Sequence, residues 1–334
     1  MKSKVDFVIL WVDGNDTIWK KEKELYIPKL DNEDNNSVNR YRDWENLKYW
    51  FRTIEKNAKW VNNIFFITYG HLPKWLNLNN PKLKIIKHED FIPKEYLPTY
   101  NSNVIEFNLY RIQELSENFV LFNDDMFLLG ETCQEVFFKD NKPVETYSEC
   151  LNVSLKNNDI YTHNLLNNIS IINKHFIKHE VYKKNLFKYI NWRYGLKKNI
   201  STLLLLPFKS FSMIDNPHLP VALKKSVLEY IWKIEKDSVE ITCKNRFRDL
   251  TDISQYLIRY FQLMSGEFYP RQYSIGKAFN LGQYNEDIFK DIEQNKYKLV
   301  CFNDSSQIDD FEKAKKDLID FFEKKYYEKS EYEI

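Results

Sequence analysis

The chain has 334 residues, of which 43% are hydrophobic and 16% aromatic, so it can bury a large core as one domain or as one domain with an insertion. Its formal net charge of +1 provides no global field that would attract nucleic acid, so we expect no nucleic-acid partner. The four cysteines are Cys133, Cys150, Cys243 and Cys301, and none of them forms a C-x-x-C pair. This spacing indicates neither a zinc site nor a disulfide scaffold, and it suits a protein of the reducing cytoplasm.

The N-terminus joins two lysines to an apolar run, as a signal peptide does. However, Asp6 interrupts this run early and no small-residue cleavage site follows it. The longest uniformly apolar stretch, residues 203–208, is far too short to cross a membrane. The sequence therefore predicts a soluble or at most peripheral protein.

The first 130 residues alternate predicted strands with predicted helices. Residues 5–12 are expected to form a buried strand, which leads through a short turn into a helix with Asp16 as its candidate cap. Residues 30–43 are polar and predict a loop. The elements that follow are predicted helices at 44–58 and 103–116 and predicted strands at 63–70, 82–91 and 118–128. This order predicts an α/β fold with a mostly parallel, Rossmann-like sheet, in which ligands bind beyond the carboxyl ends of the strands.

The pattern changes after about residue 140, and we divide the chain into three predicted parts. Residues 1–140 form the α/β half, residues 141–240 a mainly helical insertion, and residues 241–334 a return to the core that ends in a helix. Within the last part, residues 252–266 predict an amphipathic helix closed by a glycine, and residues 298–304 predict a strand.

The C-terminal residues 309–334 predict one charged amphipathic helix. Its lysines would suit an anionic membrane surface, but such a pattern is more typical of a solvated surface helix. The sequence alone gives no convincing membrane anchor.

An acidic pair interrupts the otherwise apolar stretch Leu-Phe-Asn-Asp-Asp-Met-Phe-Leu at residues 121–128. Asp124 and Asp125 repel each other and are costly to bury unless a cation meets them. Mg²⁺ or Mn²⁺ prefers such oxygen ligands, and Asn303 or Asp304 could add to them from a second strand end. The alternative is that Asn–Asp pairs only cap helices and build turns. The sequence leaves both interpretations open.

Candidate positive groups come later in the chain. Arg246 and Arg248 lie two residues apart. If this segment is extended, both guanidinium groups lie on one side of it and could bind a diphosphate. The alternative is that each forms a surface salt bridge. His218 lies between two prolines, and such a stiff loop suits a general base or a phosphate contact as well as a simple hydrogen-bonded histidine. The histidines without a comparable setting are His71, His88, His163, His175 and His179.

Several common nucleotide and hydrolase motifs are missing from the sequence. There is no G-x-x-x-x-G-K-[ST] loop, no G-x-G-x-x-G and no G-x-S-x-G, and the chain has only seven glycines. ATP-type sites and classical dinucleotide sites are therefore disfavoured.

Six stretches, in order, resemble the four conserved regions of the Stealth family. They are residues 7–16, 41–78, 97–128, 216–220, 246–252 and 301–304. That family includes bacterial capsular polysaccharide phosphotransferases and the catalytic subunit of the animal lysosomal N-acetylglucosamine-1-phosphotransferase. The long second region is the most specific part of the resemblance.

The resemblance implies a fold similar to the GT-A nucleotide-sugar transferases, with residues 1–140 binding the nucleotide sugar and residues 141–240 near the acceptor. It implies transfer of a hexose-1-phosphate, such as N-acetylglucosamine-1-phosphate, from a UDP-sugar to a hydroxyl on a glycan or lipid-linked glycan, with release of UMP. Capsule synthesis further implies work in the cytoplasm or, peripherally, at the inner face of the cell membrane. The alternatives are a metal-dependent glycosyltransferase that releases UDP and a non-catalytic glycan-assembly protein.

The resemblance also implies site residues by position. The implied substrate-binding residues are Trp11, Val12, Asp13, Gly14, Asp16, Arg42, Asp43, Asn101, Asn103 and Arg111, and Glu45 and Glu106 match the family as well. The implied ligands of Mg²⁺ or Mn²⁺ are Asp124, Asp125, Asn303 and Asp304. The implied catalytic residues are His218, Arg246, Arg248 and Asp125. We expect His218 to accept the proton of the acceptor hydroxyl, and the two arginines to stabilise the phosphoryl oxygens.

Overall fold

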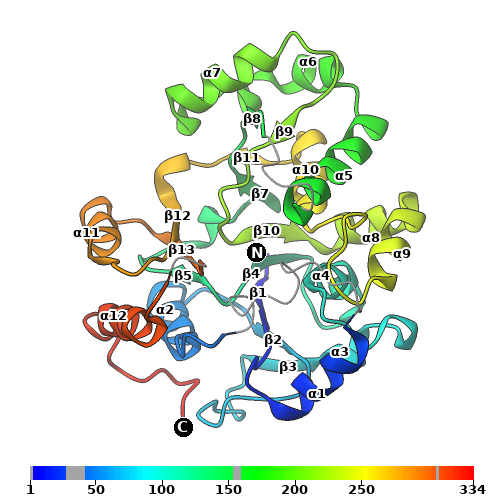
Figure 1. Ribbon diagram of the computed structural model, residues 1–334. Coiled ribbons are helices and arrows are strands. Elements are labelled where there is room, and N and C mark those ends of the chain that lie inside the picture. Colours follow the sequence, from blue (N-terminus) through cyan, green and yellow to red (C-terminus); the bar gives the residue numbers. More distant parts are fainter. Residues whose placement is uncertain (1–2, 28–41, 153–158, 306–307) are drawn as a thin grey trace.

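A sheet of mostly parallel strands runs through the middle of the molecule (Figure 1). This computed structural model describes residues 3–27, 42–152, 159–305 and 308–334, and within them the sheet has five strands in the order β10–β4–β1–β2–β3. Their bounds are β1 Val5–Trp11, β2 Ile64–Thr68, β3 Leu83–Lys87, β4 Asn118–Phe122 and β10 Val221–Lys224. Only β10 is antiparallel to its neighbour within this described sheet. The predicted α/β fold with a mostly parallel, Rossmann-like sheet is confirmed.

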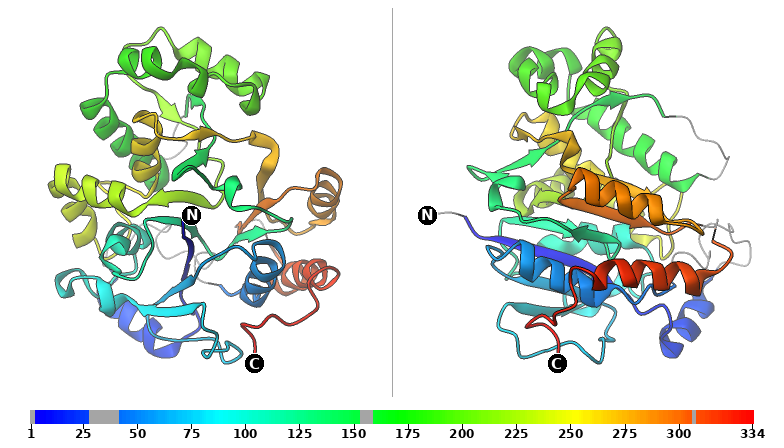
Figure 2. Two further views of the ribbon diagram at one scale, coloured as in Figure 1. Left: turned by 180° about the vertical axis from the view of Figure 1, so that it is seen from behind. Right: turned by 90° about the vertical axis from the view of Figure 1, so that its left-hand side faces the viewer.

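Helices cover both faces of this sheet (Figures 1 and 2). Their bounds are α1 Thr17–Tyr26, α2 Leu47–Asn57, α3 His88–Phe91, α4 Ser102–Asn108, α5 Ile160–His175, α6 Lys178–Tyr189, α7 Leu196–Leu205, α8 Lys225–Ile234, α9 Lys236–Lys244, α10 Tyr256–Met264, α11 Glu286–Asn295 and α12 Phe311–Glu323. Val8 of β1 and Leu121 of β4 pack with α4, α8 and α10, whereas Phe7 and Phe122 pack with α2 and α12. Neighbouring residues of one strand thus enter opposite cores, as the two-residue period of a strand requires.

Asp6 is fully buried near the start of β1, and it is satisfied there by hydrogen bonds. Its carboxylate accepts from the side-chain amide of Asn62 at 2.7 Å and from the backbone N–H groups of Asn63 at 3.1 Å and Ser116 at 2.8 Å. A buried carboxylate is tolerated when donors of this kind surround it. Asp6 therefore ties the chain that enters β2 and the chain that enters β4 to the first strand.

A second, smaller sheet begins where β4 ends. The chain turns at residues 123–125 and continues as β5, which pairs antiparallel with β13, and β13 pairs in parallel with β12. The backbone N–H of Phe302 donates to the carbonyl oxygen of Asp125 at 2.9 Å. The bounds of the shorter strands are β5 Met126–Leu128, β6 Phe138–Lys139, β7 Lys142–Glu145, β8 Glu149–Cys150, β9 Met213–Ile214, β11 Tyr269–Pro270, β12 Gly276–Asn280 and β13 Leu299–Asn303. The acidic turn therefore lies between the two sheets.

The helices α6 and α7 form the end of the molecule opposite α1, and α5 lies beside α10 between that end and the central sheet (Figure 1). Helices α5, α6 and α7 belong to the predicted helical insertion 141–240, but that range also contains β10, which is part of the central sheet. The division at residues 140 and 240 stays a prediction. No helix in the described part of the chain has the length and apolar character that crossing a membrane requires.

Most predicted elements are confirmed, with differences in their bounds. The predicted strand 118–128 is interrupted by the turn at residues 123–125 and forms the separate strands β4 and β5, and the predicted helix 252–266 begins only at Tyr256. The predicted strand 82–91 ends at Lys87, where α3 begins, and the predicted helix 103–116 leaves α-helical geometry after Asn108. The predicted helix 309–334 ends at Glu323. The predicted loop 30–43 falls almost entirely outside the described residues.

Tertiary contacts explain why the C-terminal tail is not helical. The carboxylate of Glu333 accepts from Nε and Nη2 of Arg52, each at 2.8 Å. The ring of Tyr332 packs against Phe51 at 5.2 Å between centroids. These contacts with α2 hold the tail in a path that its own helical pattern would not give.

Candidate active site

The acidic turn lies at the carboxyl ends of the parallel strands, where open α/β sheets bind ligands. A first cavity of about 460 Å³ opens beside it; its wall consists of Trp11, Val12, Gly14, Arg42, Asp43, Trp44, Asn46, Leu47, Asp124, Asp125, His218, Arg248, Phe302, Asn303 and Asp304. A second cavity, of about 340 Å³, has Asp124, Asp125, His218 and Arg248 in its wall as well. The acid pair, one histidine and one arginine therefore lie where the two cavities meet.

The two aspartates have strongly perturbed pKa values. Asp124 opens to the cavity, yet the surrounding protein restricts its hydration, and this together with the charge of Asp125 raises the pKa of Asp124 to about 7. Burial raises the pKa of Asp125 to about 6. Oδ1 of Asp125 is buried without a hydrogen-bond partner among the described residues. A buried carboxylate oxygen without a partner, beside a second carboxylate, fits a cation-binding role.

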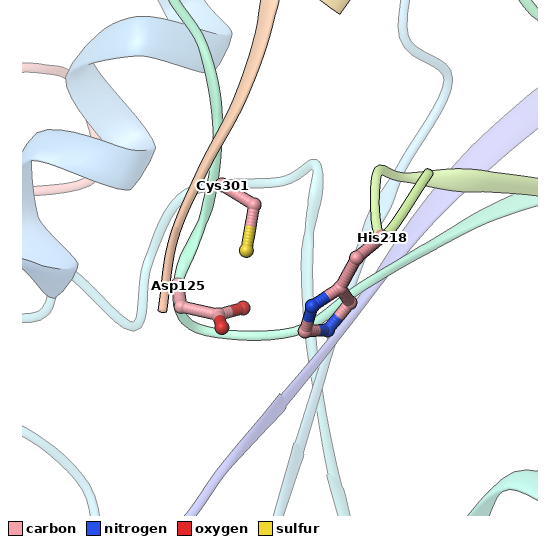
Figure 3. A group of neighbouring side chains, drawn as sticks. All are labelled: Asp125, His218 and Cys301. Carbon is pink, nitrogen blue, oxygen red and sulfur yellow. The ribbon is translucent and has the colours of Figure 1, made fainter. Parts of the chain in front are cut away.

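His218 approaches Asp125 from a separate loop, as Figure 3 shows. A ring nitrogen of His218, a carboxylate oxygen of Asp125 and the sulfur of Cys301 all lie within 4.8 Å of one another. The φ angle of His218 is +49°, a conformation that non-glycine residues adopt at a cost. Burial and the charge of Arg248 lower the pKa of His218, while a hydrogen bond with Asn303 opposes them.

Cys301 acts as a hydrogen-bond donor in this group. Its thiol donates to Oδ1 of Asn303 at 3.2 Å. Burial and the neighbouring Asp125 raise the pKa of the Cys301 thiol well above its usual value. Mg²⁺ and Mn²⁺ prefer hard oxygen ligands, so of these three side chains the carboxylate of Asp125 suits them best. The four cysteines of the chain are all free, as the sequence indicates.

Arg248 and Arg246 point to different places. Nη2 of Arg248 donates to Oγ of Ser102 at 2.7 Å, and the side chain lines both cavities. Nη1 of Arg246 instead donates to the carbonyl oxygen of Pro98 at 2.8 Å, and its guanidinium lies over Tyr26 at 4.7 Å. Residues 246 and 247 form a bend, so the two side chains do not share one side of an extended segment as we predicted. The structure brings Arg248 to the cavities and does not bring Arg246 there.

A buried network holds the segment that carries Arg248. The carboxylate of Asp252, which is fully buried, accepts from the side chains of Asn101 at 2.8 Å, Asn245 at 2.8 Å and Asn103 at 3.3 Å, and from the backbone N–H of Asp249 at 3.0 Å. Asn101 therefore has a positioning role in the structure. The implied substrate-binding role of Asn103 is compatible with its place in the wall of a third cavity of about 160 Å³.

Arg42 and Asp304 form an ion pair across the first cavity wall. Nε of Arg42 donates to Oδ2 of Asp304 at 2.5 Å, and Nη2 of Arg42 donates to Oδ1. Nε1 of Trp44 also donates to Oδ2, at 3.1 Å. Both oxygens of Asp304 are thus engaged, so a metal role for Asp304 would require it to exchange these partners.

Two family models match the N-terminal half of the chain. The model described as Stealth protein CR1, conserved region 1, matches residues 3–31, and the model described as Stealth protein CR2, conserved region 2, matches residues 40–146. Over 331 residues the chain is 43% identical to the capsular polysaccharide phosphotransferase WcwK of Streptococcus pneumoniae, with 99% of this chain and 98% of that protein covered. The chain belongs to the Stealth protein family.

Other similar proteins have related names. The exopolysaccharide phosphotransferase cps2G of Lactiplantibacillus plantarum is 38% identical, with 98% of this chain and 96% of that protein covered. The receptor polysaccharide phosphotransferase WefC of Streptococcus gordonii is 35% identical, with full coverage of both chains. Among solved structures, the chain is similar to an active-site mutant of LgtC, with 90% of this chain and 88% of that chain covered. The identity is 8% and the TM-score 0.37, so we base no argument on this similarity.

In this Stealth protein the first conserved region contributes Trp11, Val12 and Gly14 to the cavity wall. The other two predicted residues of that region, Asp13 and Asp16, take part in hydrogen bonds with other parts of the chain or with α1. The backbone N–H of Asp13 donates to Nε2 of His71 at 2.7 Å, and Asp16 caps α1 by accepting from the backbone N–H of Trp19 at 2.7 Å. The cap predicted at Asp16 is confirmed.

Four further predicted residues can be placed. Asp43 lines the first cavity, and its pKa is raised, mainly by burial. Asn303 lines the same cavity, and its Nδ2 donates to Asn280 at 3.1 Å. Glu106 lies in the wall of the third cavity, where burial raises its pKa to about 7. Arg111 lies away from the three cavities, with Nε donating to Asn108 at 2.9 Å and the guanidinium over Trp232.

Sequence reasoning missed several residues that the fold adds to the site. His88 lines the second cavity with Trp19, Thr99, Tyr100 and Ser102. It is 4% exposed, and burial lowers its pKa to about 4. From the sequence we did not predict a functional role for His88, and this was wrong. His88 directly follows β3 and therefore lies at the same edge of the sheet as the acid pair. Its place at the end of a predicted parallel strand could have identified it.

Proposed function

We propose that this Stealth protein is a sugar-1-phosphate transferase. It would move a hexose-1-phosphate, such as N-acetylglucosamine-1-phosphate, from a UDP-sugar to a hydroxyl of a glycan or lipid-linked glycan and release UMP during the synthesis of a capsular or cell-surface polysaccharide. Two facts support this proposal: its relatives are named polysaccharide phosphotransferases, and an acid pair, a histidine and an arginine meet between two cavities. Two adjoining cavities offer room for a donor and an acceptor on either side of these groups.

Asp124 and Asp125 would hold Mg²⁺, or Mn²⁺ in its place. The unpartnered buried Oδ1 of Asp125 and the opening of Asp124 to the same cavity fit such an ion. When bound, the ion would neutralise charge on the diphosphate of the donor. Burial raises the pKa of both carboxyl groups, and the charge of Asp125 raises the pKa of Asp124 further, so a cation bound between them would relieve an unfavourable arrangement.

Arg248 would contact the phosphoryl oxygens at the reacting centre. Ser102 holds its guanidinium at the junction of the cavities, so little reorganisation is needed when charge spreads over those oxygens. His218 lies in the same wall, and its loop fixes it near Asp125. In the proposed step the acceptor oxygen forms a bond to the sugar-bearing phosphorus, the bond to the bridging oxygen breaks, and UMP leaves. The imidazole of His218 accepts the hydroxyl proton.

The test is nucleotide release from UDP-N-acetylglucosamine in the presence of Mg²⁺, with and without EDTA. Release of UMP that EDTA abolishes would support cleavage between the two phosphates. Release of UDP would instead move the attack to the sugar carbon and make the protein a glycosyltransferase. Release of neither nucleotide with any common UDP-sugar would favour a non-catalytic role in glycan assembly.

A further inference from the structure

Helix α7 turns an apolar face outward. Its exposed apolar residues follow the i, i+4, i+7, i+8 spacing of one helix face and are Leu196, Ile200, Leu203 and Leu204. Thr202 and Leu205, on the opposite side of the helix, are buried. A surface helix of a globular protein normally has the reverse arrangement, with the apolar stripe against the core. The exposed fractions of Leu196 and Leu204 are 78% and 71%, so this stripe is open to its surroundings.

Neighbouring segments extend this apolar face. The 3₁₀ turn Trp192–Tyr194 leads into α7, and two hydrogen bonds between Asn191 and Asn199, at 3.0 and 2.8 Å, fix the turn against the helix. Trp192 in this turn is 75% exposed, and Phe187 near the end of α6 is 84% exposed. Phe208, just beyond α7, is exposed as well. Figure 1 shows α6 and α7 together at the end of the molecule away from α1.

The same segment is strongly basic. Residues 181–214 contain seven cationic side chains and no aspartate or glutamate, whereas the whole chain has 49 Lys and Arg against 48 Asp and Glu. The seven are Lys183, Lys184, Lys188, Arg193, Lys197, Lys198 and Lys209. Lys188 donates to the carbonyl oxygen of Gly266, and Lys198 pairs with Asp215 at 2.8 Å. The other five are exposed. We call these five cations and the exposed apolar residues between 186 and 208 the apolar–basic surface; the apolar residues are Leu186, Phe187, Trp192, Leu196, Ile200, Leu203, Leu204 and Phe208.

We propose that the apolar–basic surface docks this protein on a membrane that contains anionic lipids. Apolar side chains interleaved with lysines and arginine match an interface in which acyl chains lie beneath anionic headgroups. A second copy of the chain is a poorer partner, because a symmetric contact would place five cations against five cations. The predicted C-terminal helix is also a poorer candidate, because α12 carries acidic and basic residues side by side and its apolar residues are packed into the core.

This proposal does not depend on the proposed function, because binding is measured without turnover. The experiment is co-sedimentation of the full chain with vesicles of phosphatidylglycerol and phosphatidylcholine, and with vesicles of phosphatidylcholine alone. We expect the protein to bind the anionic vesicles, to bind neutral vesicles much more weakly, and to dissociate as the salt concentration rises. Absence of binding to the anionic vesicles overturns the proposal and leaves this face to a protein partner.

Two pairs of matched variants test whether this surface is responsible. The triple variant Trp192→Ser, Leu196→Gln, Leu204→Gln should lose at least tenfold in binding. The control Ile18→Gln, Leu25→Gln, Leu78→Gln, which removes three exposed apolar residues elsewhere, should bind normally. The variant Lys184→Gln, Lys197→Gln should lose roughly fivefold for each cation, while Lys316→Gln, Lys324→Gln in and after α12 should not. Because all these side chains are exposed, the melting temperatures should be unchanged. Equal losses in a variant and its control would overturn the assignment to this surface.

Discussion

Asn101 and Asp252 are 151 residues apart in the chain, yet Nδ2 of Asn101 donates to Oδ2 of Asp252 at 2.8 Å in a fully buried position. The same amide of Asn101 also reaches the carbonyl oxygens of Asn245 and Phe247, at 3.2 and 3.4 Å. These bonds link the beginning of α4 to the segment that presents Arg248. We regard Asn101 as a positioning residue for that arginine.

Replacement of Asn101 by alanine should therefore lower both stability and turnover. Loss of the buried bonds should cost roughly 1–3 kcal/mol of unfolding free energy, because Asp252 keeps its burial and loses a donor. Urea unfolding and UMP release measure the two effects. In an Arg248→Ala background, Asn101→Ala should reduce turnover little further, since the residue acts through Arg248. Independent, multiplicative losses would contradict the positioning role.

The acid pair should be needed for metal binding and not for folding. Asp125→Asn and Asp124→Asn should each reduce UMP release by orders of magnitude, and each ~1.4 kcal/mol of lost stabilisation corresponds to a factor of ten in rate. Stability at pH 7 should stay the same or increase, because the substitution removes repulsion between two carboxylates.

A readout besides activity is available for the same variants. Mg²⁺ should raise the melting temperature of the wild-type protein and not that of Asp125→Asn. Asp317→Asn, which disrupts only the exposed ion pair with Lys313, is the control and should respond to Mg²⁺ like the wild type. A normal Mg²⁺ response of Asp125→Asn would show that the ion is bound elsewhere.

Substitutions of Arg248 and Arg246 should differ sharply in their effect on kcat. Arg248→Ala should reduce kcat by a factor of about 100 or more, as removal of a preorganised charge donor does in other enzymes. Arg246→Ala should change kcat only a few-fold, because its guanidinium binds Pro98 and Tyr26 outside the cavities. Steady-state kinetics of both purified variants decide this. Equal loss in both would mean that Arg246 moves into the site when substrate binds.

His88 should make the stability of the protein depend on pH. Its folded-state pKa of about 4 is below the unfolded value of about 6.5, because burial disfavours the charged ring. The unfolded chain therefore binds more protons between these two pH values, and stability that is complete above pH 6.5 is lost as the pH falls toward 4. At about 1.4 kcal/mol for each pKa unit, the loss is on the order of 3 kcal/mol.

Urea unfolding at several pH values measures this effect. The difference in unfolding free energy between the wild type and His88→Gln should change in favour of the variant as the pH falls from 7 to 4.5. The substitution His179→Gln, at an exposed histidine, is the control and should leave the pH dependence unchanged. Parallel pH profiles of wild type and His88→Gln would show that the ring is not buried in its neutral form.

Much of the fold could be predicted from local pattern. Continuous apolar runs such as the one around Phe7 indicated buried parallel strands, because both faces of such a sheet are covered. The cap at Asp16 followed from its place before a helical pattern. The position of Asp124 and Asp125 at the end of an apolar strand predicted that they would lie at the ligand-binding edge, because parallel strands all end there.

Tertiary structure alone decided which side chains reach that edge. Arg246 and Arg248 have equal standing in the sequence, but a bend between them and the partners Pro98 and Ser102 send them to different places. His88 joins the site because β3 pairs with β2, and through β2 with β1 and β4, so that these parallel strands end at the same edge of the sheet. Local sequence determines helices and caps because their hydrogen bonds are short-range, and it indicates strands through the pattern of their apolar residues. The membership of a site depends on contacts between residues far apart in the chain, and only the packed fold creates them.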